Sequence, residues 1–415
     1  MAGSADIDVA RGVPRGTGGR VRDVSLRRLF AAAVAALAAT ACRTPDGPRA
    51  NVGDGGPKGD GSVAAASPSA DLLALDGPAL YTKLCAACHG DDAKGYRADN
   101  APSLVNPTYL ESATDLQIHT SIAQGRPGTA MAAYGKDLGG PLDAAAIGRI
   151  VTHLRSQGPK SHDLPPSRPG DATKGKATYA TSCQGCHGTP TARGNAVHLA
   201  NTRFLEVSSD AFLRWAVVQG RPGTPMLAFG SKLNDAEIDD VVAYVRTLDK
   251  PPPVVLLPPP TGKEPVVINP GGAAPSFTPR ADPCGPDPQK CTPDPRYVSV
   301  ADVSRALAEK RRMVIIDARS PSDWMRVHIP GAVSIPHYDL KRLSEIPNDG
   351  TWVIAYCACP HHLSGDVVNE LRKRGYKKAV VLDEGILEWH RRGYPVVAAE
   401  GVETPPSGPG GPAPK

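Results

Sequence analysis

Two short segments with the order Cys-x-x-Cys-His constrain the rest of this chain. They are Cys85-Ala-Ala-Cys88-His89 and Cys183-Gln-Gly-Cys186-His187. Two cysteine sulfurs one helical turn apart can bond covalently to the two vinyl groups of a haem, and the adjacent histidine then lies beside the iron. The order is typical of c-type haem attachment, so we expect two covalently attached haem c groups.

A second repeated segment follows each motif and supplies a methionine. Residues 125–135 and 220–230 are identical at 8 of 11 positions. Met131 lies 46 residues after Cys85, and Met226 lies 43 residues after Cys183. A loop at that distance can bring a thioether to the opposite face of the haem, where it favours electron transfer over oxygen chemistry. We expect His89 with Met131, and His187 with Met226, to bind the two irons; the alternative for a methionine is core packing.

The repeat divides the first part of the chain into two equivalent units. Residues 71–157 form the first, 158–170 a short Pro-rich joint, and 171–249 the second. In the first unit, apolar spacing predicts helices over 71–88, 113–124 and 142–156. His119, His153 and His198 align with non-histidine residues of the other unit, so we expect them to be ordinary structural residues.

The N-terminal segment predicts export. Residues 1–28 are polar and basic, and 29–41 form an unbroken apolar run that is shorter than a membrane span and typical of a signal peptide. Small residues precede Cys42, which leaves two interpretations open: lipidation of Cys42, or simple cleavage. We therefore predict a signal peptide over 1–42, followed by a flexible linker over 43–70.

Proline and glycine dominate the segment after the second unit. The chain contains 43 of each and only 5% aromatic residues, so part of it must be linker. Residues 250–296 are predicted to be a semi-rigid spacer. Cys284 and Cys291 at its end are expected to form a disulfide in an oxidising compartment. The tail at 400–415 is predicted to be disordered.

Residues 297–399 show a different pattern, with apolar runs of strand length alternating with helices. Strands are predicted over 313–317, 352–356 and 379–382, and helices over 300–310 and 364–374. This alternation predicts an α/β domain with a parallel sheet. Cys357 ends a strand and precedes a helix, where backbone N–H groups stabilise a thiolate.

The two haem-binding units resemble class I c-type cytochromes over about 170 residues, because both motifs recur in the same order. The resemblance implies two small all-α domains, each wrapped around a haem. In that family a proline carbonyl orients the proximal histidine. Pro102 matches this position and Val197 replaces it in the second unit, so the second haem is expected to differ in potential.

The C-terminal domain resembles the rhodanese-like family. The matching residues are Asp317-Ala-Arg319, residues 328–332, Cys357, Gly385, Trp389 and residues 393–395. The resemblance implies that Cys357 carries sulfur. The loop after Cys357 lacks the arginine that binds thiosulfate in many members and contains Cys359 and Pro360 instead, which argues against thiosulfate as the donor and against a related phosphatase.

These features predict an exported dihaem c-type cytochrome with an appended rhodanese-like domain, in the periplasm or on the outer face of a bacterial membrane, tethered through lipidated Cys42. Expected partners are redox proteins of the respiratory or sulfur-oxidising type and a small sulfur compound. Charges of both signs are interspersed at a net charge of +5, so no nucleic acid is expected. Two alternatives stay open: a sulfurtransferase that uses Cys357 and passes electrons to the haems, and a non-catalytic docking module.

Overall fold

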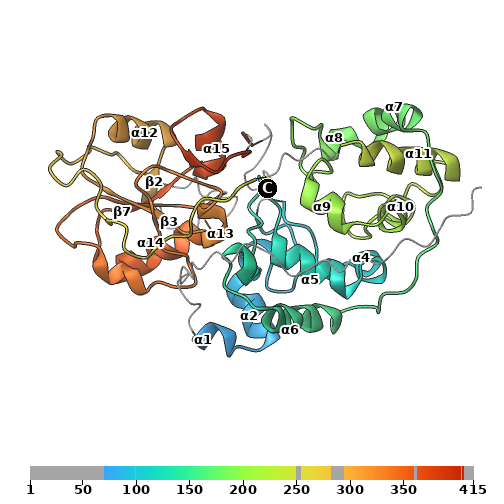
Figure 1. Ribbon diagram of the computed structural model, residues 1–415, viewed down its shortest axis with the longest axis horizontal. Coiled ribbons are helices and arrows are strands. Elements are labelled where there is room, and N and C mark those ends of the chain that lie inside the picture. Colours follow the sequence, from blue (N-terminus) through green and yellow to red (C-terminus); the bar gives the residue numbers. More distant parts are fainter. Residues whose placement is uncertain are drawn as a thin grey trace, which may run out of the picture. The chain divides into compact units, whose positions relative to one another are not determined.

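The computed structural model describes residues 70–98, 100–248, 254–281, 294–358, 362–402 and 404–405. The predicted signal peptide with Cys42, the predicted disulfide of Cys284 with Cys291, and Cys359 lie outside these residues. Figure 1 shows helices in the two N-terminal units and a sheet with helices in the C-terminal domain. Among the described helices, none combines the length and the apolar character that crossing a membrane requires.

The first unit consists of short helices connected by loops. They are α1 (Ala70–Leu73), α2 (Gly77–Leu84), α3 (Ala86–His89), α4 (Pro107–Ser112), α5 (Asp115–Gln124), the 3-10 turn η1 (Lys136–Leu138) and α6 (Ala144–Arg155). The single helix expected over 71–88 is divided into three. Asp76 accepts a hydrogen bond from the N–H of Ala79 and so begins a new helix, with Pro78 in its first turn.

The second unit repeats this arrangement with α7 (Ala172–Ser182), α8 (Gln184–His187), α9 (Thr202–Val207), α10 (Asp210–Gln219) and α11 (Asp235–Arg246). The first and last long helices of each unit cross closely. A Cβ atom on Gly77 would lie 2.3 Å from the carbonyl oxygen of Arg149, and one on Gly175 would lie 1.8 Å from that of Asp240. Glycine is required at both crossings because no side chain fits between the backbones.

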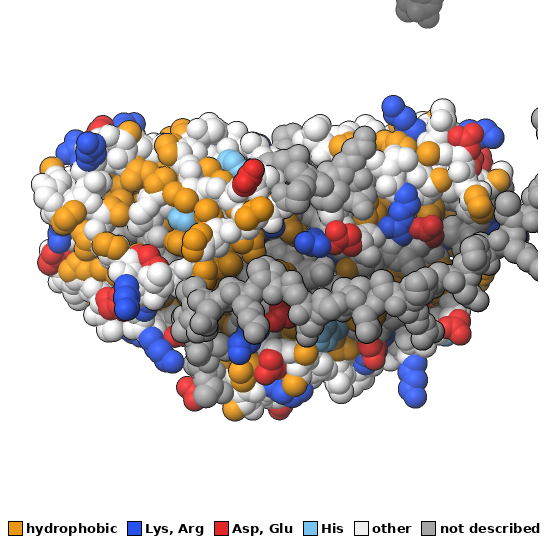
Figure 2. Space-filling view, in the orientation of Figure 1, with side chains coloured by type: hydrophobic (Ala, Val, Ile, Leu, Met, Phe, Trp, Pro, Cys, Tyr) orange, Lys and Arg blue, Asp and Glu red, His pale blue; other side chains and the backbone are white. Residues whose placement is uncertain are grey.

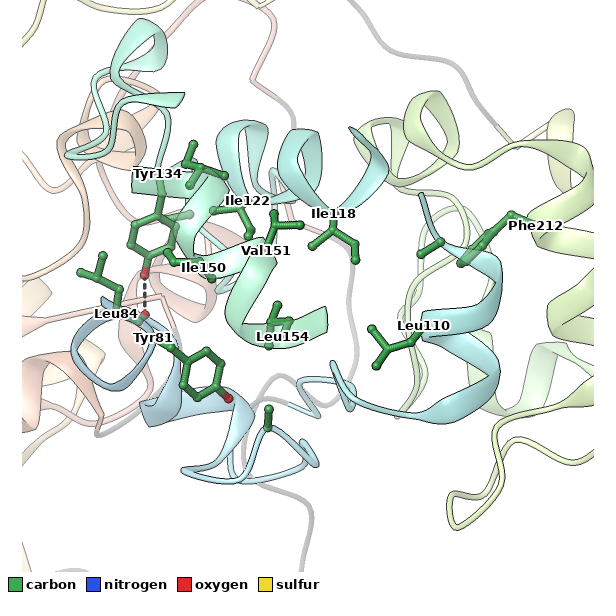
Figure 3. Close-up of a cluster of buried hydrophobic side chains, with 14 of the residues drawn as sticks. Tyr81, Leu84, Leu110, Ile118, Ile122, Tyr134, Ile150, Val151, Leu154 and Phe212 are labelled. Carbon is green, nitrogen blue, oxygen red and sulfur yellow. Dashed lines mark hydrogen bonds between the residues drawn. The ribbon is translucent and has the colours of Figure 1, made fainter. Parts of the chain in front are cut away.

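The two units share one hydrophobic cluster. It includes Leu80, Leu110, Ile147 and Ile150 from the first unit and Leu205, Phe212 and Val241 from the second. Figure 3 shows part of this cluster, with Phe212 near the helix that carries Leu110. The rings of Phe212 and Tyr109 meet edge to face, with centroids 6.2 Å apart. The units therefore bury apolar surface against each other.

The C-terminal domain is built on a six-stranded sheet in the order β1-β2-β7-β6-β3-β5. Its strands are β1 (Arg280–Ala281), β2 (Pro295–Val298), β3 (Val314–Asp317), β5 (Val333–Ser334), β6 (Val353–Tyr356) and β7 (Ala379–Leu382). All neighbouring pairs are parallel except β1 with β2. A second, antiparallel pair joins β4 (Val327–His328) to β8 (Val397–Ala398). The expected parallel α/β architecture is confirmed.

Helices cover both faces of this sheet. On one face, α14 (Leu363–Lys373) packs on the sheet through Val367, Val368 and Leu371. On the other, α12 (Val300–Ala308) and α15 (Gly385–Arg391) bury residues that include Val303 and Trp389. Two shorter segments, α13 (Pro321–Trp324) and η3 (Lys341–Glu345), complete the domain.

Part of the predicted spacer packs on the C-terminal domain. In the described portion, 254–281, Val255 pairs with Glu400 and Ile268 pairs with Met313 in isolated bridges. Glu264 forms an ion pair with Arg342 at 3.0 Å, and Phe277 packs edge to face on Trp352. These contacts make the segment an extension of the domain, because its backbone and side chains find partners there.

Candidate haem and sulfur sites

The two Cys-x-x-Cys-His motifs adopt the same local structure. In the first, the N–H of Cys85 donates to the carbonyl of Tyr81 at 2.8 Å and the N–H of His89 donates to that of Cys85 at 2.9 Å. The equivalent bonds at Cys183 and His187 measure 2.9 and 3.0 Å. A short helix in each unit, α3 or α8, thus carries the second cysteine and the histidine on one turn.

Both histidines are oriented by a backbone carbonyl. His89 donates from Nδ1 to Pro102 O at 2.9 Å, and His187 donates from Nδ1 to Val197 O at 2.7 Å. The valine retains the contact because a carbonyl is present at every residue. Burial lowers the pKa of both imidazoles, so they stay neutral, and the bond from Nδ1 leaves Nε2 to bind iron.

The methionine loops are closed by matching bonds. The N–H of Arg126 donates to the carbonyl of Met131 at 2.7 Å, and that of Arg221 donates to Met226 at 2.9 Å. Gly125 and Gly220 have positive φ angles of 64° and 62° and admit no Cβ, because the returning loop lies within 2.6 Å of that position. This geometry explains why the segment is nearly identical in the two units.

Threonine hydroxyls hold the other end of each loop. Thr129 accepts from the N–H of Met131 at 3.1 Å, and Thr224 accepts from that of Met226 at 3.2 Å. In the first unit, Tyr134 also donates to Leu84 O at 3.0 Å, so the methionine loop is attached to the helix before Cys85 (Figure 3). The donor set is two thiols, a neutral imidazole and a thioether per unit, which fits a c-type haem.

The other histidines have structural partners. His119 contacts Ala144 O through Nε2 at 3.3 Å, and His198 contacts Thr189 O through Nε2 at 2.7 Å. The ring of His153 packs against Tyr81, in the place where Tyr244 packs against Tyr179 in the second unit. Each therefore has a role outside iron binding.

The units meet through a reciprocal pair of hydrogen bonds that the sequence did not predict. Asn106 donates from Nδ2 to Pro222 O at 2.8 Å, and Asn201 donates from Nδ2 to Pro127 O, also at 2.8 Å. Both asparagines precede equivalent helices, and both prolines lie in methionine loops. The only sequence signal was the match between Asn106 and Asn201 in the repeat. The two bonds therefore attach each methionine loop to the residue that precedes α4 or α9 in the other domain.

Cys357 lies at the end of β6 with its side chain buried. Its sulfur is 3.3 Å from Ser364 Oγ in the first turn of α14. The N–H of Ile386 donates to its carbonyl at 3.0 Å, and a Cβ on Gly385 would lie 2.8 Å from that oxygen. Ser364 is a partner that sequence reasoning missed. Residues 359–361 of the loop lie outside the described residues.

The matched residues Asp317 and Arg319 form a buried ion pair. Arg319 donates from Nη2 to Asp317 Oδ2 at 2.7 Å and also to Val327 O at 2.6 Å. Tyr356 donates to the same carboxylate oxygen at 2.8 Å. Although burial opposes the charge, Asp317 raises the pKa of Arg319 above its ordinary value. These groups satisfy one another and hold the strands beside Cys357.

Known protein families match the two N-terminal units and the C-terminal domain separately. The family "Cytochrome C oxidase, cbb3-type, subunit III" matches residues 73–154 and 170–245, and "Rhodanese-like domain" matches 299–392. The subunit CcoP of a cbb3-type cytochrome c oxidase from Azospirillum sp. (strain B510) is 32% identical over 200 residues, covering 43% of this chain and 64% of that protein. The FixP subunit from Bradyrhizobium diazoefficiens is 32% identical over 204 residues, covering 46% and 67%.

A sulfurtransferase from Allochromatium vinosum is 35% identical over 100 residues, covering 24% of this chain and 92% of that protein. The chain belongs to the cbb3-type cytochrome c family and carries a rhodanese-like domain. The cytochrome domains imply covalently bound haem c and a function in electron transfer, as expected from the sequence. The chain spans about two thirds of the length of the cbb3-type relatives.

The rhodanese-like domain contacts the methionine loop of the first cytochrome domain. Ser322, on α13, donates to Ala133 O at 2.7 Å, two residues after Met131. Tyr338 of the same domain packs against the cytochrome core cluster. On the face shown in Figure 2, acidic and basic side chains are interspersed.

Proposed function

We propose that the chain carries electrons between partner proteins through two haem c groups that exchange electrons with each other. Cys85 and Cys88 would hold the first haem with His89 and Met131 as iron ligands. Cys183, Cys186, His187 and Met226 would do the same for the second. The observation that carries the proposal is the reciprocal pair of bonds by which Asn106 and Asn201 attach each methionine loop to the opposite domain.

The residues of the chain hold each haem in a defined environment. The haem iron supplies one-electron chemistry when bound. Nδ1 of each histidine is occupied by a carbonyl, which fixes the ring and leaves Nε2 for the metal. The thioether of Met131 or Met226, bound to the iron, would raise its potential and would favour electron transfer over oxygen chemistry. The apolar cluster that the two domains share packs against Cys85, Met131 and Cys183, and apolar surroundings of this kind limit the access of solvent to a metal site.

The ligands are tested in haem-loaded protein by changing one methionine at a time. Met131→Ala and Met226→Ala should each remove about half of the charge-transfer absorption of methionine-bound ferric haem and lower one of two potentials. The buried Met313→Leu is the matched control, because Met313 lies in the rhodanese-like domain. Full absorption in both alanine variants, with two haems attached by mass, would contradict the ligand assignment.

We also propose that the chain is exported and tethered through Cys42 at the outer face of a bacterial membrane. Support comes from the apolar run at 29–41 and from the c-type haem motifs, whose attachment chemistry belongs to compartments outside the cytoplasm. Respiratory redox proteins are the proposed partners. Mass spectrometry of the mature N-terminus should find a lipid on Cys42. A mature N-terminus that begins after residue 41 or 42 and carries no lipid would instead indicate simple cleavage of the signal peptide.

A second candidate function is sulfur transfer by Cys357. The contact of its sulfur with Ser364 Oγ and the similarity to a sulfurtransferase favour it. The Cys357 thiolate would attack the terminal sulfur of a low-molecular-weight persulfide. A new S–S bond forms on Cys357, the S–S bond of the donor breaks, and the donor leaves as a thiolate, so no net oxidation occurs.

Sulfur transfer is tested on haem-loaded protein treated separately with thiosulfate and with a persulfide. We expect one added sulfur on Cys357 with the persulfide and none in Cys357→Ser, while Cys357→Ser keeps both haems. Haem absorbance followed in the same experiment shows whether electrons reach the iron. An unmodified Cys357 with both donors would leave the domain as a docking module.

A further inference from the structure

Two arginines at the contact between the cytochrome domains have no carboxylate partner among the described residues. Arg126 donates from Nη1 to Gly125 O and from Nη2 to Ser121 Oγ, both at 2.8 Å. Arg221 donates from Nη1 to Thr108 Oγ1 and to Gly220 O, both at 3.2 Å. All four acceptors are neutral, so neither positive charge is balanced.

The fold supplies carboxylates to other arginines at matching positions. Arg155 pairs with Asp115 at 2.6 Å, and its equivalent in the second domain, Arg246, pairs with Asp210 at 2.5 Å. In each repeat, the arginine at the end of the last helix therefore has an acidic partner, whereas the arginine of the methionine loop has none among the described residues. The difference is reproduced in both domains, which indicates a shared requirement at Arg126 and Arg221.

Burial makes the missing counter-charge costly. It lowers the pKa of Arg126, and it lowers that of Arg221 to about 10. Neutral hydrogen bonds compensate a buried charge less well than an anion does, because they offer only partial negative charge. A guanidinium in this position is therefore favoured when an anion joins it.

Aromatic rings hold both guanidinium groups in place across the contact. Arg126 Cζ lies 5.8 Å from the ring centre of Phe204 in the other domain, and Arg221 Cζ lies 6.0 Å from that of Tyr109 in the other domain. Tyr109 and Phe204 are equivalent in the repeat, as are the two arginines. Each arginine is thus positioned by the opposite domain before any ligand binds.

We propose that Arg126 and Arg221 bind the propionate carboxylates of the two haems at the contact between the domains. Each arginine lies five residues before the candidate methionine ligand on the same closed loop, and haem carries two carboxylates at one edge. A guanidinium can bind a carboxylate through two parallel hydrogen bonds. The inference rests on the proposed haem-binding function and assigns these arginines as positioning residues.

This role predicts a specific change in the potentials of haem-loaded protein. Arg126→Gln and Arg221→Gln should each lower one haem potential, because an unbalanced propionate favours the oxidised iron. They should also make that potential fall with rising pH over about pH 5 to 8, as the released propionate titrates nearer neutrality. Arg→Lys at either position should lower the potential less than Arg→Gln does, because lysine keeps the positive charge but not the two parallel hydrogen bonds. Lys136 and Lys176 are exposed, so Lys136→Gln and Lys176→Gln are controls that remove the same charge away from the contact between the domains.

Haem mass and the methionine absorption separate the two proposals. Glutamine variants that keep both haems and the methionine band, yet show unchanged potentials and pH profiles, would overturn the role of the arginines alone. Unchanged protein gives a second test that needs no variant, in which redox-difference infrared spectra follow the propionate bands. We expect no propionate titration over about pH 5 to 8; a propionate that titrates there would overturn the proposal.

Discussion

At the scale of single residues, the two equivalent asparagines at the domain contact have different tasks. Both donate across the contact. Asn201 in addition accepts from the N–H of Phe204 at 3.2 Å and so caps α9, whereas Asn106 makes no such cap on α4. Asparagine is common at the first position of a helix for this reason. One side chain thus serves helix and interface together.

Replacing each asparagine with alanine should separate these contributions. Asn106→Ala should lower the free energy of unfolding by about 1 kcal/mol through the lost interface bond. Asn201→Ala should lower it by about 2 kcal/mol, because the helix cap is lost as well. Urea unfolding of haem-loaded protein measures both. Equal losses in the two variants would show that the cap contributes nothing.

Asp323 predicts a dependence of stability on pH. Burial raises its pKa to about 6, with Asp317 adding to the effect and Arg319 and Arg326 opposing it. In the described structure its Oδ2 atom has no hydrogen-bond partner. The folded state binds the proton on Asp323 more tightly than the unfolded state does. The contribution of this group to the free energy of unfolding is therefore fully present at low pH and is lost as the pH rises through the folded pKa.

The expected loss is up to about 3 kcal/mol between about pH 4 and pH 6, with no further change from this group above that range. Asp323→Asn should remove this component and stabilise the protein at neutral pH. The measurement is urea unfolding at several pH values, taken as the difference between variant and unchanged chain. A difference that does not vary with pH would contradict the raised pKa.

At the scale of elements, residues 254–281 pack on the rhodanese-like domain and constrain one glycine. Gly331 has a φ of +75°, and a Cβ there would lie 2.5 Å from Ile268 Cγ2. Gly350 has a φ of +84° and open space around it. The two glycines share the backbone conformation and differ in the contact with the segment, which makes them a matched pair.

Gly331→Ala should destabilise the domain by about 2 to 3 kcal/mol and Gly350→Ala by about 1 kcal/mol, since only the first adds a steric clash. Combining Gly331→Ala with Ile268→Ala should cost less than the sum of the single changes by about 1 kcal/mol. Denaturant unfolding of the four variants gives the comparison. Strict additivity would show that the segment does not press on Gly331.

The elements also show what the sequence could and could not predict. The sequence predicted both haem motifs and the helices α5 and α6. Motif spacing and apolar periodicity depend only on residues that are close together in the chain. The division at Asp76 depends on a side-chain cap, and the packing of Glu264 on Arg342 depends on a distant partner. The sequence could not predict that Arg126 and Arg221 lack an acidic partner among the described residues. That property depends on the contact between the two domains, which the spacing of residues in the chain does not reveal.

At the scale of the whole molecule, the hydrophobic clusters predict how many parts unfold independently. One cluster contains residues of both cytochrome domains, among them Leu110 and Phe212. The rhodanese-like domain has two further clusters on the faces of its own sheet. Apolar burial is the main source of cooperativity, so domains that share a core unfold together.

Calorimetry of the haem-loaded chain should therefore show two transitions, one for the cytochrome pair and one for the rhodanese-like domain. The double variant Asn106→Ala/Asn201→Ala should lower the midpoint of the cytochrome transition by several degrees, about 2 to 4 °C per kcal/mol for a unit of this size, and leave the other in place. Three separate transitions in the unchanged chain would mean that the shared cluster does not couple the haem domains. Electron exchange between the haems would then depend on a contact that opens at little cost.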